Sequence, residues 1–368
     1  MTSLKTPLCG LLGIEHPIIQ SGMGQVAGPE LVAEVSEAGA LGIIAGLRRT
    51  PDELRARIHT VRGLTRRPFG VNLWLHDHLR PPADMARVPD STVRAVQTAL
   101  NGFRARLGLP ASHARPPATA DVVDGCIDVI LDERVPVFSV ALGTPSPELI
   151  RRCHARGIRV VTMAATVTDA RTMEAAGVDA IVAQGTEAGG HRSVGGKPES
   201  PAAIGVGTLA LVPQVVDAVQ VPVVAAGGIA DGRGLVAALA LGAQGVLLGT
   251  RFVVTRESSA APFQKKALLE AESDATAITD SVSGLWARYL ANTYVREYDA
   301  SGAPVLPGLV QSAAAQDIFA EGTRREDPEF VPMATGQSVG LIRDLPGARD
   351  VVETIVREAR AVLTRLAG

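Results

Sequence analysis

One stretch of the chain combines a buried-strand pattern with residue types that suit proton transfer. Residues 179–183 form a short apolar run, and Gln184–Ser193 follows it with a Gly-Gly pair and a histidine. In α/β enzymes, catalytic groups commonly stand where a strand ends in a loop. The pKa range of histidine also suits general base catalysis near neutral pH. We therefore predict that His191 is the catalytic base and that Gly189 and Gly190 let a cofactor approach the backbone; the alternative is a purely structural histidine.

Two later glycine-rich segments predict a phosphate site. Gly227 and Gly228 end one apolar run, and Gly249 and Thr250 end the next one. In α/β barrels, the loops after the seventh and eighth strands commonly bind phosphate through backbone N–H groups. Glycine lets the anion come close to the backbone. The alternative is that both segments are tight barrel turns without a ligand.

The N-terminal segment contains a pattern that competes with this interpretation. Residues 22–27 satisfy the dinucleotide template G-x-G-x-x-G/A after a short apolar run. That template also requires an acidic residue about 20 positions later, and no carboxylate occurs between position 42 and Asp52. We therefore expect a loop at the end of the first strand, where a flat ring lies against the backbone. The residues assigned to this contact are Gly22, Met23, Gly24 and Gln25.

Two amide side chains stand near the ends of apolar runs. Asn72 and Gln184 need hydrogen-bonding partners if they are buried. An isoalloxazine ring offers such partners, and an internal bond between strands is the equal alternative. Gln244, inside the apolar segment 233–251, is assigned to the same cofactor-binding set.

The remaining histidines give no comparable signal. His76 and His78 alternate around Asp77, but no third ligand group lies nearby in the sequence. We therefore expect surface polar groups in a lid and no metal site. The other histidines, His16, His59, His113 and His154, are expected at solvated positions.

Apolar runs alternate with helical patterns along most of the chain. Eight strands are expected near residues 17–20, 41–45, 69–75, 135–140, 159–164, 180–184, 221–226 and 245–250. Parallel strands need helical crossovers, and eight such units in about 250 residues match a (β/α)₈ TIM barrel. Proline-rich residues 76–120 predict an insertion after the third strand, with an amphipathic helix near 91–107. Residues 256–335 predict a second insertion, and the two insertions would together form a lid. Residues 336–368 would then lead back to the barrel and form its eighth helix near 347–366.

Charge and cysteine content restrict the class of partner. Lys and Arg number 36 and Asp and Glu 38, so the net charge of −2 favours neither nucleic acid nor an anionic membrane. The three cysteines, Cys9, Cys126 and Cys153, are too dispersed for a disulfide framework or a zinc site. The N-terminus lacks the apolar core of a signal peptide, so a cytoplasmic protein is expected. A homodimer is compatible with the sequence.

Three segments resemble the nitronate monooxygenase family, formerly called 2-nitropropane dioxygenases. They are Pro17–Gly24, Gln184–Arg192 and Ala225–Gly232, the last continuing to Phe252. The resemblance covers most of residues 10–255. Two positions depart from it, because the family often has Pro-Met at Gly22-Met23 and Gly at Ser193.

The resemblance implies a fold, a cofactor and a reaction. Residues 1–255 would form an FMN-binding (β/α)₈ barrel and residues 256–335 a lid that contacts substrate. The FMN phosphate would lie on Gly227, Gly228, Gly249 and Thr250. The ring would lie near Gly22, Met23, Gln25, Asn72 and Gln184. His191 would match the family histidine that deprotonates a nitroalkane, and the nitronate would be oxidised with O2.

Two other functions remain open at this point. Related sequences with similar motifs include NAD(P)H-dependent flavin reductases that act on a quinone or an enoyl thioester. A phosphate-ester-binding barrel without catalytic activity is the third possibility, because a fold alone does not fix a function.

Overall fold

Eight parallel strands form a closed barrel in the computed structural model, which describes residues 4–194 and 200–368. The strands are β1 (Ile18–Gln20), β2 (Gly42–Ala45), β3 (Phe69–Trp74), β4 (Val137–Ala141), β5 (Arg159–Ala164), β6 (Ala180–Gln184), β8 (Val223–Ala226) and β9 (Gly245–Leu248). Their spatial order is β1-β9-β8-β6-β5-β4-β3-β2. A parallel bridge between Ile19 and Leu41 joins the two ends of this order. The predicted (β/α)₈ barrel is therefore confirmed.

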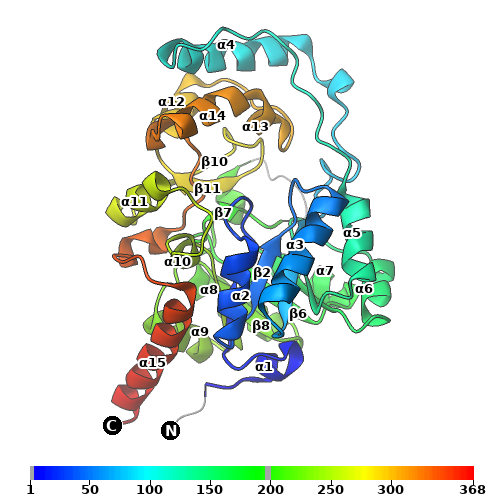
Figure 1. The fold of residues 1–368 in the computed structure, drawn as a ribbon, viewed down its shortest axis with the longest axis vertical. Coiled ribbons are helices and arrows are strands. Elements are labelled where there is room, and N and C mark those ends of the chain that lie inside the picture. The colour runs from blue at the N-terminus through cyan, green and yellow to red at the C-terminus, as the bar shows by residue number, and fades with distance from the viewer. Residues whose placement is uncertain (1–3, 195–199) are drawn as a thin grey trace.

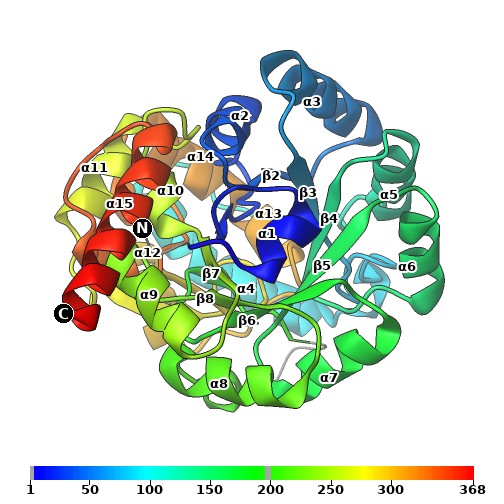
Figure 2. The ribbon, with the colours of Figure 1, turned by 90° about the horizontal axis from the view of Figure 1, so that it is seen from below.

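Helices surround the strands as a ring (Figure 2). The helices are α2 (Pro29–Glu37), α3 (Pro51–Leu64), α5 (Val123–Asp132), α6 (Pro147–His154), α7 (Val167–Ala176), α8 (Thr208–Ala218), α9 (Gly232–Ala240) and α15 (Ala348–Ala367). The eighth barrel helix, which was predicted near 347–366, lies within one residue of the bounds of α15. Local signals explain many ends: Thr50 and Glu53 form a capping box at the start of α3, and Gly177 ends α7 in the left-handed region. Helix α15 packs against α9 and α2, so it occupies the place of the eighth helix.

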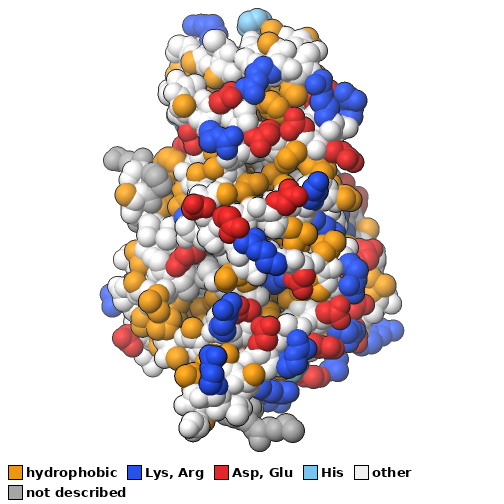
Figure 3. All heavy atoms as spheres, turned by 90° about the vertical axis from the view of Figure 1, so that its left-hand side faces the viewer, with side chains coloured by type: hydrophobic (Ala, Val, Ile, Leu, Met, Phe, Trp, Pro, Cys, Tyr) orange, Lys and Arg blue, Asp and Glu red, His pale blue; other side chains and the backbone are white. Residues whose placement is uncertain are grey.

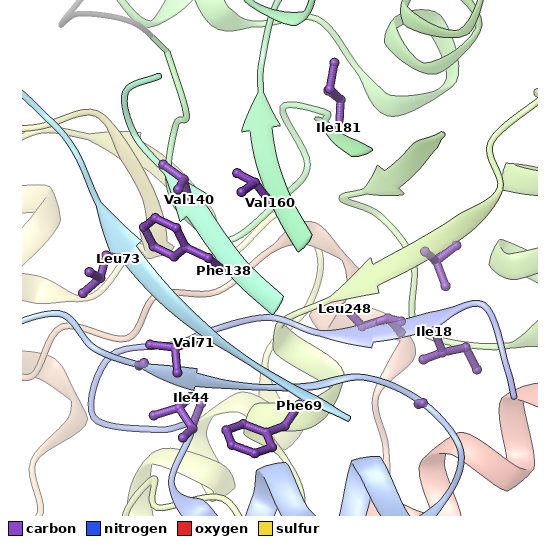
Figure 4. Close-up of a cluster of buried hydrophobic side chains, with 14 of the residues drawn as sticks. Ile18, Ile44, Phe69, Val71, Leu73, Phe138, Val140, Val160, Ile181 and Leu248 are labelled. Atoms are coloured by element: carbon purple, nitrogen blue, oxygen red, sulfur yellow. The ribbon is translucent and has the colours of Figure 1, made fainter. Parts of the chain in front are cut away.

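The strands are buried on both faces, because alternate side chains point to opposite sides. One set, including Val71, Phe138 and Ile181, packs outward against the helices (Figure 4). The other set, including Ile43 and Val182, fills the barrel interior. The short helix α1 (Pro7–Leu12) packs with this interior set and covers the amino-terminal end of the barrel.

Two insertions lie together over the carboxyl ends of the strands (Figure 1). The first contains the 3-10 turn η1 (Met85–Arg87) and α4 (Asp90–Arg106). The second contains α10 (Thr250–Val253), α11 (Pro262–Glu270), β10 (Thr276–Thr279), β11 (Ala287–Leu290), α12 (Thr293–Ser301), α13 (Val310–Ala314), α14 (Gln316–Arg324), η3 (Pro328–Phe330) and η4 (Gln337–Leu341). A separate apolar cluster joins α4 to α12 and α14, so the two insertions share one core.

The second insertion also pairs with a short strand of the barrel that the sequence did not predict. Gly190 and His191 form β7 (Gly190–His191), which pairs antiparallel with β11 in a three-stranded sheet with β10. The segment after β6, which was interpreted as a loop, therefore contains a short strand. The partner strand lies almost 100 residues later, so no local pattern could reveal the pairing.

The surface carries mixed charges. Figure 3 shows Lys and Arg interspersed with Asp and Glu on one face, without a large field of one sign. No helix among the described residues is long and apolar enough to span a bilayer.

Candidate active site

A cavity of about 660 Å³ lies between the carboxyl ends of the barrel strands and the second insertion. Most of the residues predicted from sequence line it together. They are Gly22, Met23, Gly24, Gln25, Asn72, Gln184, Gly189, Gly190, His191, Gly227, Gly228, Gly249 and Thr250. The volume is in the range of cavities that hold cofactors and drug-sized molecules.

Gln244 does not join this group. It precedes β9, so it lies at the amino-terminal end of the barrel, where the Thr6 hydroxyl donates to its backbone carbonyl at 2.6 Å. Its assignment to the cofactor site is therefore wrong. The side chain stands at the start of a strand, and only the carboxyl ends of the strands face the cavity.

His191 lies on the cavity wall, half-buried between the barrel and the insertion. Its ring stands edge-on to Trp74, with ring centroids 4.4 Å apart. Burial, with smaller effects of Arg48 and His76, lowers the pKa of His191 to about 3. The imidazole is therefore neutral at neutral pH and able to accept a proton.

A hydroxyl group from the insertion holds the imidazole. His191 Nε2 lies 2.7 Å from Ser283 Oγ, and Ser283 Oγ also donates to the Leu285 carbonyl at 3.2 Å. When the hydroxyl donates to Leu285, Nε2 of His191 must be the donor, and Nδ1 then carries the free lone pair. The Tyr289 ring lies edge-on to that of His191, with centroids 6.2 Å apart, and burial raises the pKa of Tyr289 to about 12. Ser283 therefore connects His191 to the backbone of the second insertion.

The Gln184 amide fixes the segment that carries His191. Its nitrogen donates to the His191 carbonyl at 2.9 Å, and its oxygen accepts from the Ser193 amide at 2.9 Å. Below it lies the Arg192 guanidinium, which is 1% exposed and donates to the Gly185 carbonyl at 2.6 Å. Burial, together with Arg288, lowers the pKa of Arg192 to about 10, so it stays charged. These bonds hold the end of β6 and the start of β7 in a fixed relation.

Asn72 points into the barrel interior at the end of β3. Its nitrogen donates to the hydroxyl and the carbonyl of Ser139 on β4, at 3.1 and 3.2 Å. The Asn72 nitrogen therefore makes the hydrogen bond between strands that was the alternative to a cofactor contact. The side chain still lines the cavity. A Cβ at Gly22 would lie 2.4 Å from the Asn72 Cβ. Glycine at this position is therefore required by the close approach of Asn72.

The glycine-rich loops fit a flavin phosphate and ring. The backbone N–H groups of Gly228, Gly249 and Thr250 have no acceptor within residues 4–194 and 200–368. Unpaired backbone donors around a cavity are suited to an anion. A Cβ at Gly190 would meet no atom within 4 Å, so the space in front of it is open. The donor set and the open backbone are compatible with bound FMN.

Several residues around His191 were not predicted from sequence. Trp74 could have been found, because it ends the same strand as Asn72. Ser283, Tyr289 and Ser312 come from the second insertion, where no local motif marks them. His76 was expected at the surface and is buried instead, which lowers its pKa to about 4. No group of three or more metal-ligating side chains occurs in the described part of the chain.

Comparisons with known proteins agree with this geometry. The family model for nitronate monooxygenase matches residues 5–358. A probable nitronate monooxygenase of Staphylococcus saprophyticus is 33% identical over 362 residues, which cover 98% of this chain and 99% of the relative. A second one, from Staphylococcus aureus strain Newman, is 35% identical over 363 residues and 98% of both chains.

Two solved structures are similar over nearly their full length. Nitroalkane oxidase from Streptomyces ansochromogenes is 34% identical with a TM-score of 0.85, over 98% of this chain and 99% of that one. FabK from Thermotoga maritima is 32% identical with a TM-score of 0.77, over 99% of both chains. The chain thus belongs to the nitronate monooxygenase family and is a flavin-dependent oxidoreductase.

Proposed function

We propose that this protein binds FMN in the cavity and oxidises alkyl nitronates and nitroalkanes with O2. The observation that carries the proposal is the position of the His191 imidazole, which lines the same cavity as the unpaired amides of the glycine loops. The similarity to a nitroalkane oxidase supports the substrate class.

The cofactor would be held mainly by backbone groups. The amides of Gly228, Gly249 and Thr250 would bind its phosphate, and the segment from Gly22 to Gln25 would lie against its ring. When bound, FMN would supply the two-electron acceptor and the subsequent reaction with O2.

His191 would take the proton from the carbon next to the nitro group. The electron pair of the C–H bond then moves onto the nitro oxygens, which gives the nitronate anion. A buried imidazolium is unfavourable by itself, as the pKa of about 3 indicates. The anion formed in the same step would compensate for that cost, because opposite charges attract strongly in a cavity shielded from water. Ser283 and Trp74 keep the ring in place for this transfer.

The proposal is tested with the purified protein. We expect a flavin spectrum, release of FMN on denaturation and O2 consumption with a nitroalkane. A protein without flavin, or one with flavin that leaves every nitroalkane and nitronate unchanged, would rule the proposal out.

The similarity to FabK supports one alternative. A flavin reductase that takes electrons from NAD(P)H and acts on a quinone or an enoyl thioester would use the same barrel. Such an enzyme would oxidise NADH rapidly and would not depend on a nitro compound.

A further inference from the structure

Arg48 lines the active-site cavity with His191, yet it belongs to neither the glycine loops nor the contacts of His191. It follows the end of β2 with a φ of 59°, in the left-handed region that residues other than glycine rarely adopt. Arg48 is an exposed residue that lines the cavity, and its charge contributes to the lowered pKa of His191. Arg48 and His191 therefore line one cavity, and a group bound there can meet both side chains.

Two buried arginines have carboxylate partners, whereas Arg48 has none among the described residues. Arg104 pairs with Asp317 and Arg251 pairs with Asp344, each at 2.7 Å. Among the described residues, the only side chain that Arg48 bonds is the Ser312 hydroxyl of α13. A guanidinium has five N–H donors, so most of them remain available.

We propose that Arg48 binds the oxyanion group of the substrate, such as the two oxygens of a nitronate. This inference rests on the proposed function and deepens it, because it identifies a residue that selects substrates carrying or developing negative charge on oxygen. A planar guanidinium matches two oxygens of one group with two parallel hydrogen bonds.

The placement of Arg48 fits the proton transfer to His191. The neutral nitroalkane becomes an anion in that step, and its new charge lies on the nitro oxygens. A fixed cation at those oxygens stabilises the charge as it develops. The same cation opposes the imidazolium, so it can help only if the substrate anion lies between the two groups.

Inorganic nitrate is a suitable probe, because it is a flat oxyanion of similar shape. The experiment measures nitrate binding to the FMN-loaded protein by calorimetry and by the change in flavin absorption. It also measures the KM for a nitronate. The variants are Arg48→Gln and Arg48→Lys, and the matched control is Arg66→Gln, which removes one positive charge from an exposed residue before β3.

We expect nitrate to bind the unsubstituted protein and to compete with the nitronate. Arg48→Gln should weaken nitrate binding and raise the KM by about tenfold or more, the usual effect of losing hydrogen bonds to a charged group. Arg48→Lys should give a nitrate affinity and a KM between those of the unsubstituted protein and Arg48→Gln. Arg66→Gln should change neither quantity. FMN content should be equal in all four proteins.

Three results would overturn the proposal. The first is absent nitrate binding in the unsubstituted protein, and the second is unchanged nitrate affinity in Arg48→Gln with a lowered Tm, which would make Arg48 a structural contact to α13. The third is loss of FMN from Arg48→Gln alone, which would assign the residue to the cofactor. Nitrate calorimetry does not require turnover, so a failure of the proposed reaction remains distinguishable from a failure of this inference.

Discussion

The two sides of the cavity are built in different ways. The barrel side consists of glycine loops at strand ends, and it presents mainly backbone groups. The insertion side presents side chains, among them Ser283, Tyr289 and Ser312. Under the proposed function, the roles are divided: the barrel would hold the cofactor, and the insertion would set the surroundings of His191 and the substrate.

The largest effect is expected at His191, where the two sides meet. His191→Asn should lower kcat/KM for a neutral nitroalkane by about 10²- to 10⁴-fold, the usual contribution of a general base. A preformed nitronate serves as the control, since it needs no deprotonation and should still react. Because the pKa of His191 is about 3, the rate in the unsubstituted enzyme should hold from pH 7 to pH 5 rather than fall near pH 6.5. Equal losses with both substrates would contradict the role as a base.

On the barrel side, Gly227→Ala should remove the cofactor. Gly227 has a φ of 107°, and a Cβ there would lie 2.9 Å from Thr208 Oγ1. Gly302→Ala is the control, because Gly302 has a φ of 64° and no atom within 4 Å of such a Cβ. Both changes should lower the free energy of unfolding by about 1–3 kcal/mol through backbone strain. Only Gly227→Ala should also lower the FMN content, and full FMN content in this variant would contradict the assignment of the loop.

On the insertion side, Arg104→Leu should destabilise the shared core of the two insertions. Arg104 is 2% exposed and bonds Asp317 at 2.7 Å and the Ala314 carbonyl at 2.7 Å. We expect the free energy of unfolding, measured with urea, to fall by about 3 kcal/mol, because the change leaves buried partners unpaired. Arg106→Leu on the same helix is the control, and its exposed ion pair with Glu297 should contribute less than about 1 kcal/mol. A similar fall in the free energy of unfolding in both variants would show that the buried bonds of Arg104 stabilise the insertions no more than the exposed ion pair of Arg106 does.

Ser283→Ala should have the smallest effect. Loss of the hydroxyl removes the partner of His191 Nε2, so kcat should fall about tenfold, comparable to one hydrogen bond to a group that becomes charged. Ser283→Thr should restore part of the rate, and FMN content should stay constant. An unchanged kcat in Ser283→Ala would show that Trp74 and the backbone suffice to orient the ring.

The same contrast explains what the sequence could predict. The barrel strands and the glycine loops follow from local periodicity and from the position of glycines at strand ends, and the structure confirms the barrel. Gln244 was misplaced because the two ends of a four-residue strand are adjacent in sequence but face opposite ends of the barrel. Ser283 and Tyr289 could not be found, because the pairing of β7 with β11 depends on contacts almost 100 residues apart.

The most direct test of the account compares electron donors without oxygen. The FMN-loaded protein is mixed anaerobically with propionate 3-nitronate, with a neutral nitroalkane or with NADH, and the visible flavin absorption is followed. We expect rapid bleaching by both nitro compounds and little or none by NADH. Rapid bleaching by NADH, with none by either nitro compound, would contradict it and favour the reductase.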